Sequence, residues 1–111
     1  IYIDDIVEGI IKVLYTPPFN QKPQHRVLNI GNNSPEKLMY FITTLEDCLS
    51  TTLHKKVEFK KEFEPIKPGD VHKTFASTNA LEDLVGFKPK TSIKDGLQEF
   101  TNWYVFYYKK E

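Results

Sequence analysis

Four stretches of this 111-residue sequence repeat apolar residues at the spacing of a helix, and prolines and glycines separate them. The apolar residues of the first stretch are Ile3, Ile6, Val7, Ile10, Ile11 and Leu14. This pattern predicts an amphipathic helix that Pro17 and Pro18 bring to an end. We expect Asp4 or Asp5 to cap its first turn. Gly9 disfavours a helix interior, which predicts that another segment approaches closely at this position.

The second and third stretches also carry local signals for where a helix begins and ends. Ser34 is expected to cap the second helix, with Pro35 in its first turn. Its apolar stripe consists of Leu38, Phe41, Ile42, Leu45, Cys48 and Leu49. A shorter helix is predicted at about residues 79–85, with Gly86 as a left-handed terminating residue and Phe87 as its hydrophobic contact.

The last stretch is predicted to be a helix that is aromatic over more than one face. Ser92 and Asp95 have the spacing of a capping box and indicate where it starts. Its predicted core face contains Ile93, Leu97, Phe100, Tyr104 and either Tyr107 or Tyr108. Trp103 and Phe106 lie off this stripe, so we expect a further domain or a partner subunit to cover them.

Two shorter stretches favour β-strands. Residues 26–30 are rich in branched side chains and precede a turn, and residues 57–60 alternate apolar and charged side chains as a half-buried edge strand does. With the helices, these stretches predict an α+β fold of about four helices and a few short strands. The length predicts a single domain over residues 1–111.

Charge and composition narrow the possible partners. Fifteen basic residues balance fifteen acidic ones, which gives no general attraction to nucleic acid or to an anionic membrane. No stretch is long and apolar enough to cross a bilayer, and nothing resembles a secretory signal. Cys48 is the only cysteine and is interpreted as a small buried hydrophobe. We therefore expect a soluble cytoplasmic protein without nucleic-acid or membrane partners.

Few residues carry recognisable catalytic chemistry. The five glycines do not have the spacing of a dinucleotide-binding or phosphate-binding loop, and no tyrosine has a lysine four positions later. His25, His54 and His72 are far apart in the sequence and lack ligand partners, so no metal site is predicted. Asp4 and Asp5 are adjacent on a helix and should point in different directions, which argues against a catalytic carboxylate pair.

The run Lys67-Pro68-Gly69-Asp70 is the strongest candidate site. Proline and glycine favour a tight turn, which would present a cation and a carboxylate at its two ends. A lysine can bind a diphosphate, and a carboxylate can accept hydrogen bonds from ribose hydroxyls. The alternative is an ordinary turn with a surface ion pair.

Five segments in this order resemble the C-terminal part of extended short-chain dehydrogenase/reductases that act on nucleotide sugars, most of all UDP-glucuronate 4-epimerases. They are Tyr2–Val7 with Gly9, Asn29–Leu38, Lys67–Ala76, Leu84–Leu97 and Trp103–Tyr104. The resemblance implies that Lys67 contacts the nucleotide diphosphate and that Asp70 lies by the ribose. Lys67 stands where the family commonly has arginine or glutamine, and Ser77 where it often has aspartate.

The resemblance also implies what this chain does not contain. Family enzymes bind NAD on an N-terminal Rossmann domain and use a Tyr-x-x-x-Lys pair, and the chain opens at Ile1 as if cut from a longer polypeptide. We therefore expect a non-catalytic portion that binds a UDP-sugar but not NAD, with the Rossmann domain of the same polypeptide as its partner and a homodimer as a possibility. The alternatives are part of a nucleotide-sugar dehydratase, a stand-alone binding or assembly module, and a helical interaction domain without a sugar ligand.

Overall fold

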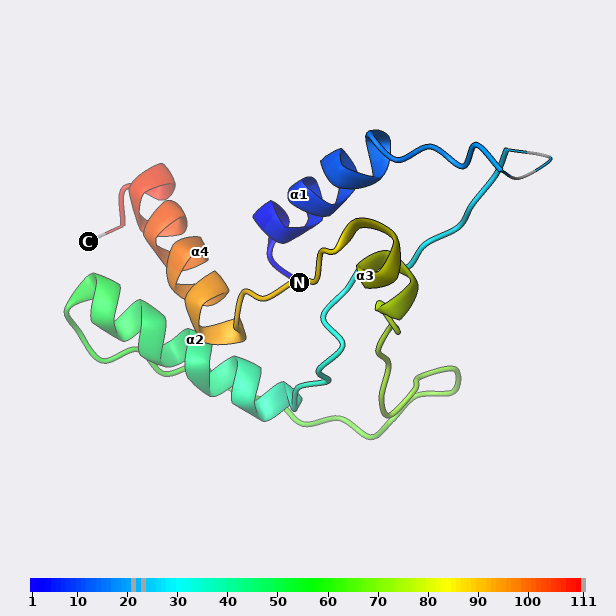
Figure 1. The fold of residues 1–111 in the computed structure, drawn as a ribbon. Coiled ribbons are helices and arrows are strands. Elements are labelled where there is room, and N and C mark those ends of the chain that lie inside the picture. The colour runs from blue at the N-terminus through cyan, green and yellow to red at the C-terminus, as the bar shows by residue number, and fades with distance from the viewer. Residues whose placement is uncertain (21, 23, 111) are drawn as a thin grey trace. The chain divides into compact units, whose positions relative to one another are not determined.

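The structure, a computed structural model, describes residues 1–20, 22 and 24–110. Four helices form in this part of the chain: α1 (Ile3–Leu14), α2 (Leu38–Leu53), α3 (Asn79–Val85) and α4 (Ile93–Tyr108) (Figure 1). The chain divides into two compact units. The first contains α1 and α3, with the described residues of Ile1–Pro35 and Phe75–Thr91. The second contains α2 and α4, within Glu36–Thr74 and Ser92–Glu111.

The predicted α+β class is wrong, because residues 1–20, 22 and 24–110 contain no strand. A strand needs a neighbour to which its backbone can donate and from which it can accept hydrogen bonds. Neither predicted stretch has one: residues 26–30 and 57–60 follow irregular paths, and Val27 is 77% exposed. The architecture is helical, with long irregular connections.

Side chains of α2 satisfy the backbone of the segment that was predicted to be an edge strand. The amide of Val57 donates to Ser50 Oγ at 2.9 Å, and the amide of Phe59 donates to Glu46 Oε1 at 2.7 Å. Lys61 Nζ bonds to the same oxygen at 2.5 Å. The hydrogen bond from Lys61, and then that from the Phe59 amide, hold the pKa of Glu46 below its ordinary value of 4.5. Glu46 thus fixes this segment along α2 in place of a neighbouring strand.

The first unit is built where α1 meets two other segments at Gly9. A Cβ atom added at Gly9 would collide with Ile30 Cδ1 and would lie 3.1 Å from Phe87 Cε1. The predicted close approach at this glycine is therefore confirmed. Phe87, Leu81 and Thr78 are buried in the same unit.

Asp5 has a different role from the predicted helix cap. The residue before α1 is Tyr2, and no side chain caps the helix. Asp5 is buried instead, and its Oδ2 accepts a hydrogen bond from the Thr91 amide at 2.9 Å. Asp4 is exposed, so the two carboxylates do point in different directions. This hydrogen bond connects α1 to Thr91, the last residue of the segment Phe75–Thr91.

Three other predicted helix boundaries can be compared directly. The Ser34 cap is wrong, because α2 begins at Leu38 after Lys37, without a side-chain cap. Gly86 ends α3 in the left-handed conformation with φ of 64°, as predicted. Ser92 caps α4 as predicted: its Oγ accepts from the amide of Asp95 at 3.1 Å and donates to the carboxylate of Asp95 at 2.7 Å.

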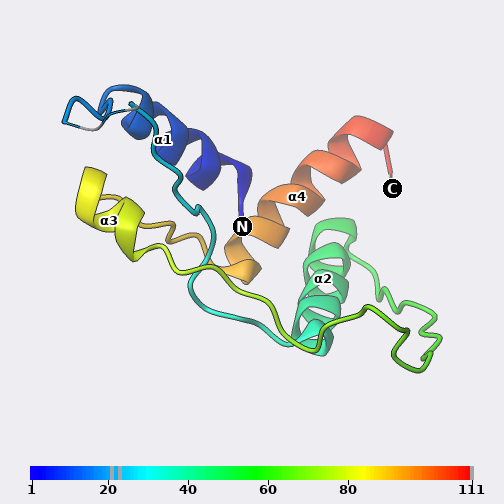
Figure 2. The ribbon, with the colours of Figure 1, turned by 90° about the vertical axis from the view of Figure 1, so that its right-hand side faces the viewer.

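The second unit is formed by α2 packed along α4, which lie side by side in both views (Figures 1 and 2). Cys48 and Leu97 are buried, as predicted, but the other buried residues of the two helices are Thr44 and Thr101. Each threonine hydroxyl bonds to a carbonyl of its own helix, at 2.6 and 3.0 Å respectively, which lowers the cost of burying it.

A polar cluster links the two helices beside this core. Gln98 Nε2 on α4 donates to Thr52 Oγ1 on α2 at 2.9 Å and to Asn102 Oδ1 at 3.0 Å. The sequence pattern did not predict this cluster, because its members interrupt the apolar stripes. Several large apolar side chains of both helices lie outside this core, among them Leu38 on α2 and Phe106 on α4.

Those large side chains are exposed to solvent. On α4, Trp103 is 50% and Phe106 84% exposed, and stacked or tilted ring contacts connect Phe100, Trp103, Tyr104, Tyr107 and Tyr108. On α1, Ile6 and Val13 are half-buried, whereas the other aliphatic side chains are exposed: Ile3, Val7, Ile10, Ile11 and Leu14. Among the described helices, none combines the length and the hydropathy that crossing a membrane requires.

Candidate functional site

Lys67 and Asp70 lie at the two ends of a tight turn in the connection between α2 and α3. The amide of Asp70 donates to the carbonyl of Lys67 at 3.0 Å, which closes a four-residue turn. Pro68 fixes φ at the second position, and Gly69 has φ of +95° at the third, as a type II turn requires. The sequence Pro-Gly therefore dictates this turn, as predicted.

The carboxylate of Asp70 strengthens the turn. Its Oδ2 accepts a hydrogen bond from the amide of Lys67 at 3.0 Å. The two residues thus bond to each other twice, once through backbone atoms and once through this side chain. Both are exposed, so the second carboxylate oxygen of Asp70 can accept hydrogen bonds from a ligand.

The side chain of Lys67 does not pair with Asp70. Its Nζ lies 2.8 Å from Glu64 Oε2, and the two side chains are 70% and 66% exposed. An exposed ion pair of this kind is worth about 0–1 kcal/mol, so a more highly charged anion can replace the glutamate at little cost. Sequence reasoning missed Glu64, although its position three residues before Lys67 could have indicated the pair.

The chemistry open to this turn is recognition of a ligand. The turn carries one exposed cation at its first residue and one exposed carboxylate at its last. This pair suits a ligand that has an anionic group beside hydroxyl groups.

Two other segments that resemble the epimerase family meet in the first unit. A Cβ atom added at Gly31 would lie 3.5 Å from the Cβ of Ala76. Gly31 belongs to the segment Asn29–Leu38, and Ala76 follows the Lys67–Asp70 turn by six residues. Both residues belong to the first unit, so this contact lies within that unit.

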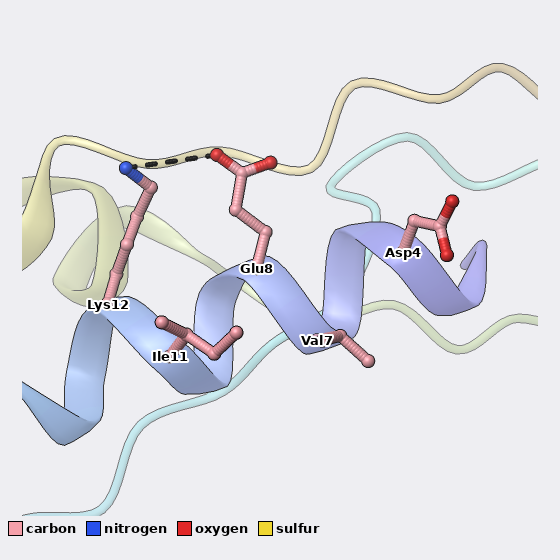
Figure 3. A pocket seen from close by; sticks show the side chains of 5 residues that line it. All are labelled: Asp4, Val7, Glu8, Ile11 and Lys12. Carbon is pink, nitrogen blue, oxygen red and sulfur yellow. Dashed lines mark ion pairs between the residues drawn. The ribbon is translucent and has the colours of Figure 1, made fainter.

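A shallow depression on α1 is a separate feature. It has a volume of about 380 Å³ and is lined by Asp4, Val7, Glu8, Ile11 and Lys12, with an ion pair of 3.8 Å between Glu8 and Lys12 (Figure 3). Neither Lys67 nor Asp70 contributes to it.

Neither the cysteine nor the potential metal ligands form a second candidate site among the described residues. Cys48 is buried, and desolvation raises the pKa of its thiol, which disfavours the reactive thiolate. No group of three histidine, cysteine, aspartate or glutamate side chains could hold a metal ion in the part of the chain that the structure describes.

Comparison with known proteins gives one consistent relationship. No family model matches the sequence. An uncharacterized 37.6 kDa protein from Escherichia coli O111:H- is 43% identical over 97% of the chain. A probable UDP-glucuronate 4-epimerase from Rhizobium meliloti is 33% identical over 98% of the chain, and UDP-glucuronate 4-epimerase 3 from Arabidopsis thaliana is 34% identical over 96%.

The relatives are much longer than this chain. The matches cover 34%, 34% and 26% of these three proteins, so the chain spans about a third of the curated relatives it matches. The match lies in the C-terminal part of the epimerases, as the sequence motifs predict. The chain is therefore a relative of the UDP-glucuronate 4-epimerases and corresponds to their C-terminal part.

Proposed function

We propose that this chain is the sugar-nucleotide-binding part of an NAD-dependent 4-epimerase that acts on a UDP-hexuronic acid. The observation that carries the proposal is the Lys67–Asp70 turn, which holds an exposed cation and an exposed carboxylate on a fixed backbone. Lys67 binds the diphosphate once it leaves Glu64, and Asp70 accepts from the ribose hydroxyls through its unused oxygen.

We propose that NAD binds outside this chain. A dinucleotide is normally held by a glycine-rich turn at the start of a helix. The residues before α1, α2, α3 and α4 are Tyr2, Lys37, Thr78 and Ser92, and none follows such a turn. We therefore assign NAD binding and the redox chemistry to the two-thirds of the longer relatives that this chain does not match. A reducing, cytoplasmic location agrees with the unpaired Cys48.

Calorimetric titration of the 111-residue chain with UDP, UDP-glucuronate and NAD tests the proposal. We expect weak binding of both uridine nucleotides, loss of that binding in Lys67→Ala, and no binding of NAD. Lys60→Ala is the matched control, because Lys60 forms a similarly exposed ion pair with Glu62 at 2.7 Å outside the turn.

A second variant tests the ion pair between Lys67 and Glu64. Glu64→Gln removes the carboxylate that competes with a phosphate for Lys67, so uridine nucleotides should bind several-fold more tightly. Equal affinity in the wild type, Lys67→Ala and Glu64→Gln, or no uridine-nucleotide binding by folded protein, would contradict the proposal.

The exposed aromatic face of α4 favours a second function, that of an assembly module. Phe106 and Trp103 are at least half exposed, and large exposed apolar patches on proteins commonly mark contacts. Sedimentation of the wild type and of Phe106→Glu distinguishes the two functions. Self-association that this substitution abolishes, without any uridine-nucleotide binding, would favour the assembly module.

A further inference from the structure

Helix α2 lies between two other segments of the second unit. On one side, Thr52 Oγ1 accepts a hydrogen bond from Gln98 Nε2 of α4 at 2.9 Å, and Cys48 is buried. Glu46 and Ser50 stand two residues from Cys48 in the sequence, which places them on the opposite side of the helix. The packing of α2 against α4 therefore leaves these two polar side chains available to bind another segment.

The segment that they bind is residues 57–61, which we refer to as the α2 strap (Figure 1). Val57 and Phe59 are half-buried, and their amides donate to side chains of α2. Lys61 ends the strap with its Nζ 2.5 Å from Glu46 Oε1. The side chains of this ion pair are only 29% and 12% exposed, so water and salt screen it less than they screen an ion pair on the surface.

A short and restricted piece of chain connects the strap to the Lys67–Asp70 turn. Lys61 precedes the first residue of the turn by six positions. Pro65 and Pro68 have fixed φ angles, and each also restricts the residue before it. Because this connection has little backbone freedom, a displacement of Lys61 also displaces the turn.

We propose that Glu46 is a positioning residue for the Lys67–Asp70 turn, which it holds in place on the second unit through the strap. The inference rests on the proposed function in one respect, namely that the turn binds a sugar nucleotide. Glu46 acts without touching the ligand, because its Oε1 accepts from Lys61 and from the Phe59 amide. It favours binding by reducing the number of positions that the turn takes before the ligand arrives.

The size of the effect follows from the length of chain between the turn and its nearest tie to α2. With Glu46 in place, this length is the six residues from Lys61 to Lys67. Without it, the next tie is the Val57 amide, ten residues before Lys67. A flexible tether of the greater length explores roughly twice the volume. The apparent affinity for a nucleotide should therefore fall roughly two-fold.

A second substitution lengthens the tether further. Ser50→Ala removes the hydroxyl that accepts from the Val57 amide. The next tie is then the amide of Lys55, which donates to the carbonyl of Ser50 at 3.2 Å and lies twelve residues before Lys67. Together with the loss of Glu46, this change should weaken binding roughly three-fold.

The test compares three substitutions on α2 in the 111-residue chain. Glu46→Ala removes both bonds to the strap, whereas Glu46→Gln keeps an oxygen that can accept from the Phe59 amide. Asp47→Ala is the matched control, because it deletes the next carboxylate of the same helix, which is exposed. The measurements are the nuclear magnetic relaxation of the Gly69 and Asp70 amides without ligand, and the calorimetric affinity for UDP. Circular dichroism establishes that each variant is folded.

We expect the two amides to become more mobile in Glu46→Ala and the affinity for UDP to fall roughly two-fold, or roughly three-fold when Ser50→Ala is added. Glu46→Gln should lie between Glu46→Ala and the wild type, and Asp47→Ala should match the wild type. A role of Glu46 in stability alone would lower the unfolding midpoint but leave the mobility of the turn and the affinity of the folded chain unchanged. That result would overturn the proposal.

The relaxation measurement also separates this inference from the proposed function. If no variant binds UDP, the wild type included, the proposed function fails. The mobility of the Gly69 and Asp70 amides still decides whether Glu46 holds the turn: an increase confined to Glu46→Ala and Glu46→Gln supports it, and equal mobility in all variants overturns it.

Discussion

Gly9→Ala measures how tightly the first unit is packed. Replacing a glycine inside an exposed helix by alanine normally stabilises a protein by about 1 kcal/mol. Here the new methyl group would overlap Ile30 Cδ1 and press on the buried ring of Phe87, at 3.1 Å from Cε1. Overpacking a well-filled site costs about 1–3 kcal/mol. We therefore expect a net loss of about 1 kcal/mol in the free energy of unfolding.

A double-mutant cycle isolates the cause. Ile30→Val deletes the Cδ1 methyl that an alanine at position 9 would meet, and by itself costs about 1 kcal/mol. In that background Gly9→Ala should cost less than in the wild type, with a favourable coupling of about 1 kcal/mol. Urea unfolding followed by circular dichroism measures all four variants. If Gly9→Ala stabilises the wild type, or if the coupling is zero, the packing described around Gly9 is wrong.

Three further predictions concern other polar groups. Thr78 Oγ1 is buried and has no hydrogen-bond partner among the described residues, so Thr78→Val should raise the free energy of unfolding by about 1 kcal/mol. Ser92→Ala removes the bond to the Asp95 amide and should lower that free energy by about 1 kcal/mol, as urea unfolding would show. The lowered pKa of Glu46 means that its hydrogen bond with Lys61 stabilises the fold fully above pH 4.5 and is lost as the pH falls through the folded-state pKa. Glu46→Gln should therefore reduce the loss of stability below pH 4.5, and an unchanged acid titration would refute the assignment.

Local signals predicted the helices well because the residues that specify them are close in the sequence. The period of apolar residues located all four helices, Gly86 ended α3, and Ser92 with Asp95 began α4. The Pro68-Gly69 turn belongs with these successes, since both residues restrict the backbone at their own positions.

Predictions that depended on distant partners failed. A strand was expected at residues 57–60, but its amides bond to Ser50 and Glu46 on the preceding helix. Asp4 or Asp5 was expected to cap α1, but no side chain does so, and the partner of Asp5 is the amide of Thr91, 86 residues along the chain. Alternation and capping preference describe what a segment can do, and tertiary contacts decide which partner it uses.

The candidate site was predictable in its residues and only partly in its geometry. Lys67 and Asp70 were singled out because a proline-glycine turn separates a cation from a carboxylate. The sequence did not indicate that Asp70 would bond to the amide of Lys67 while the lysine side chain pairs with Glu64. Side-chain choice among several exposed charges depends on small energy differences that sequence spacing does not resolve.

The most direct test of the central claim is to map the backbone amides of the 111-residue chain by nuclear magnetic resonance while UDP-glucuronate is added. The amides of Lys67, Gly69 and Asp70 should show the largest shifts, and UDP alone should reproduce most of them, because the diphosphate and ribose make the proposed contacts. Free glucuronate should produce little change. Shifts concentrated elsewhere, or none at these three amides at saturating nucleotide, would contradict the assignment of the turn as a sugar-nucleotide site.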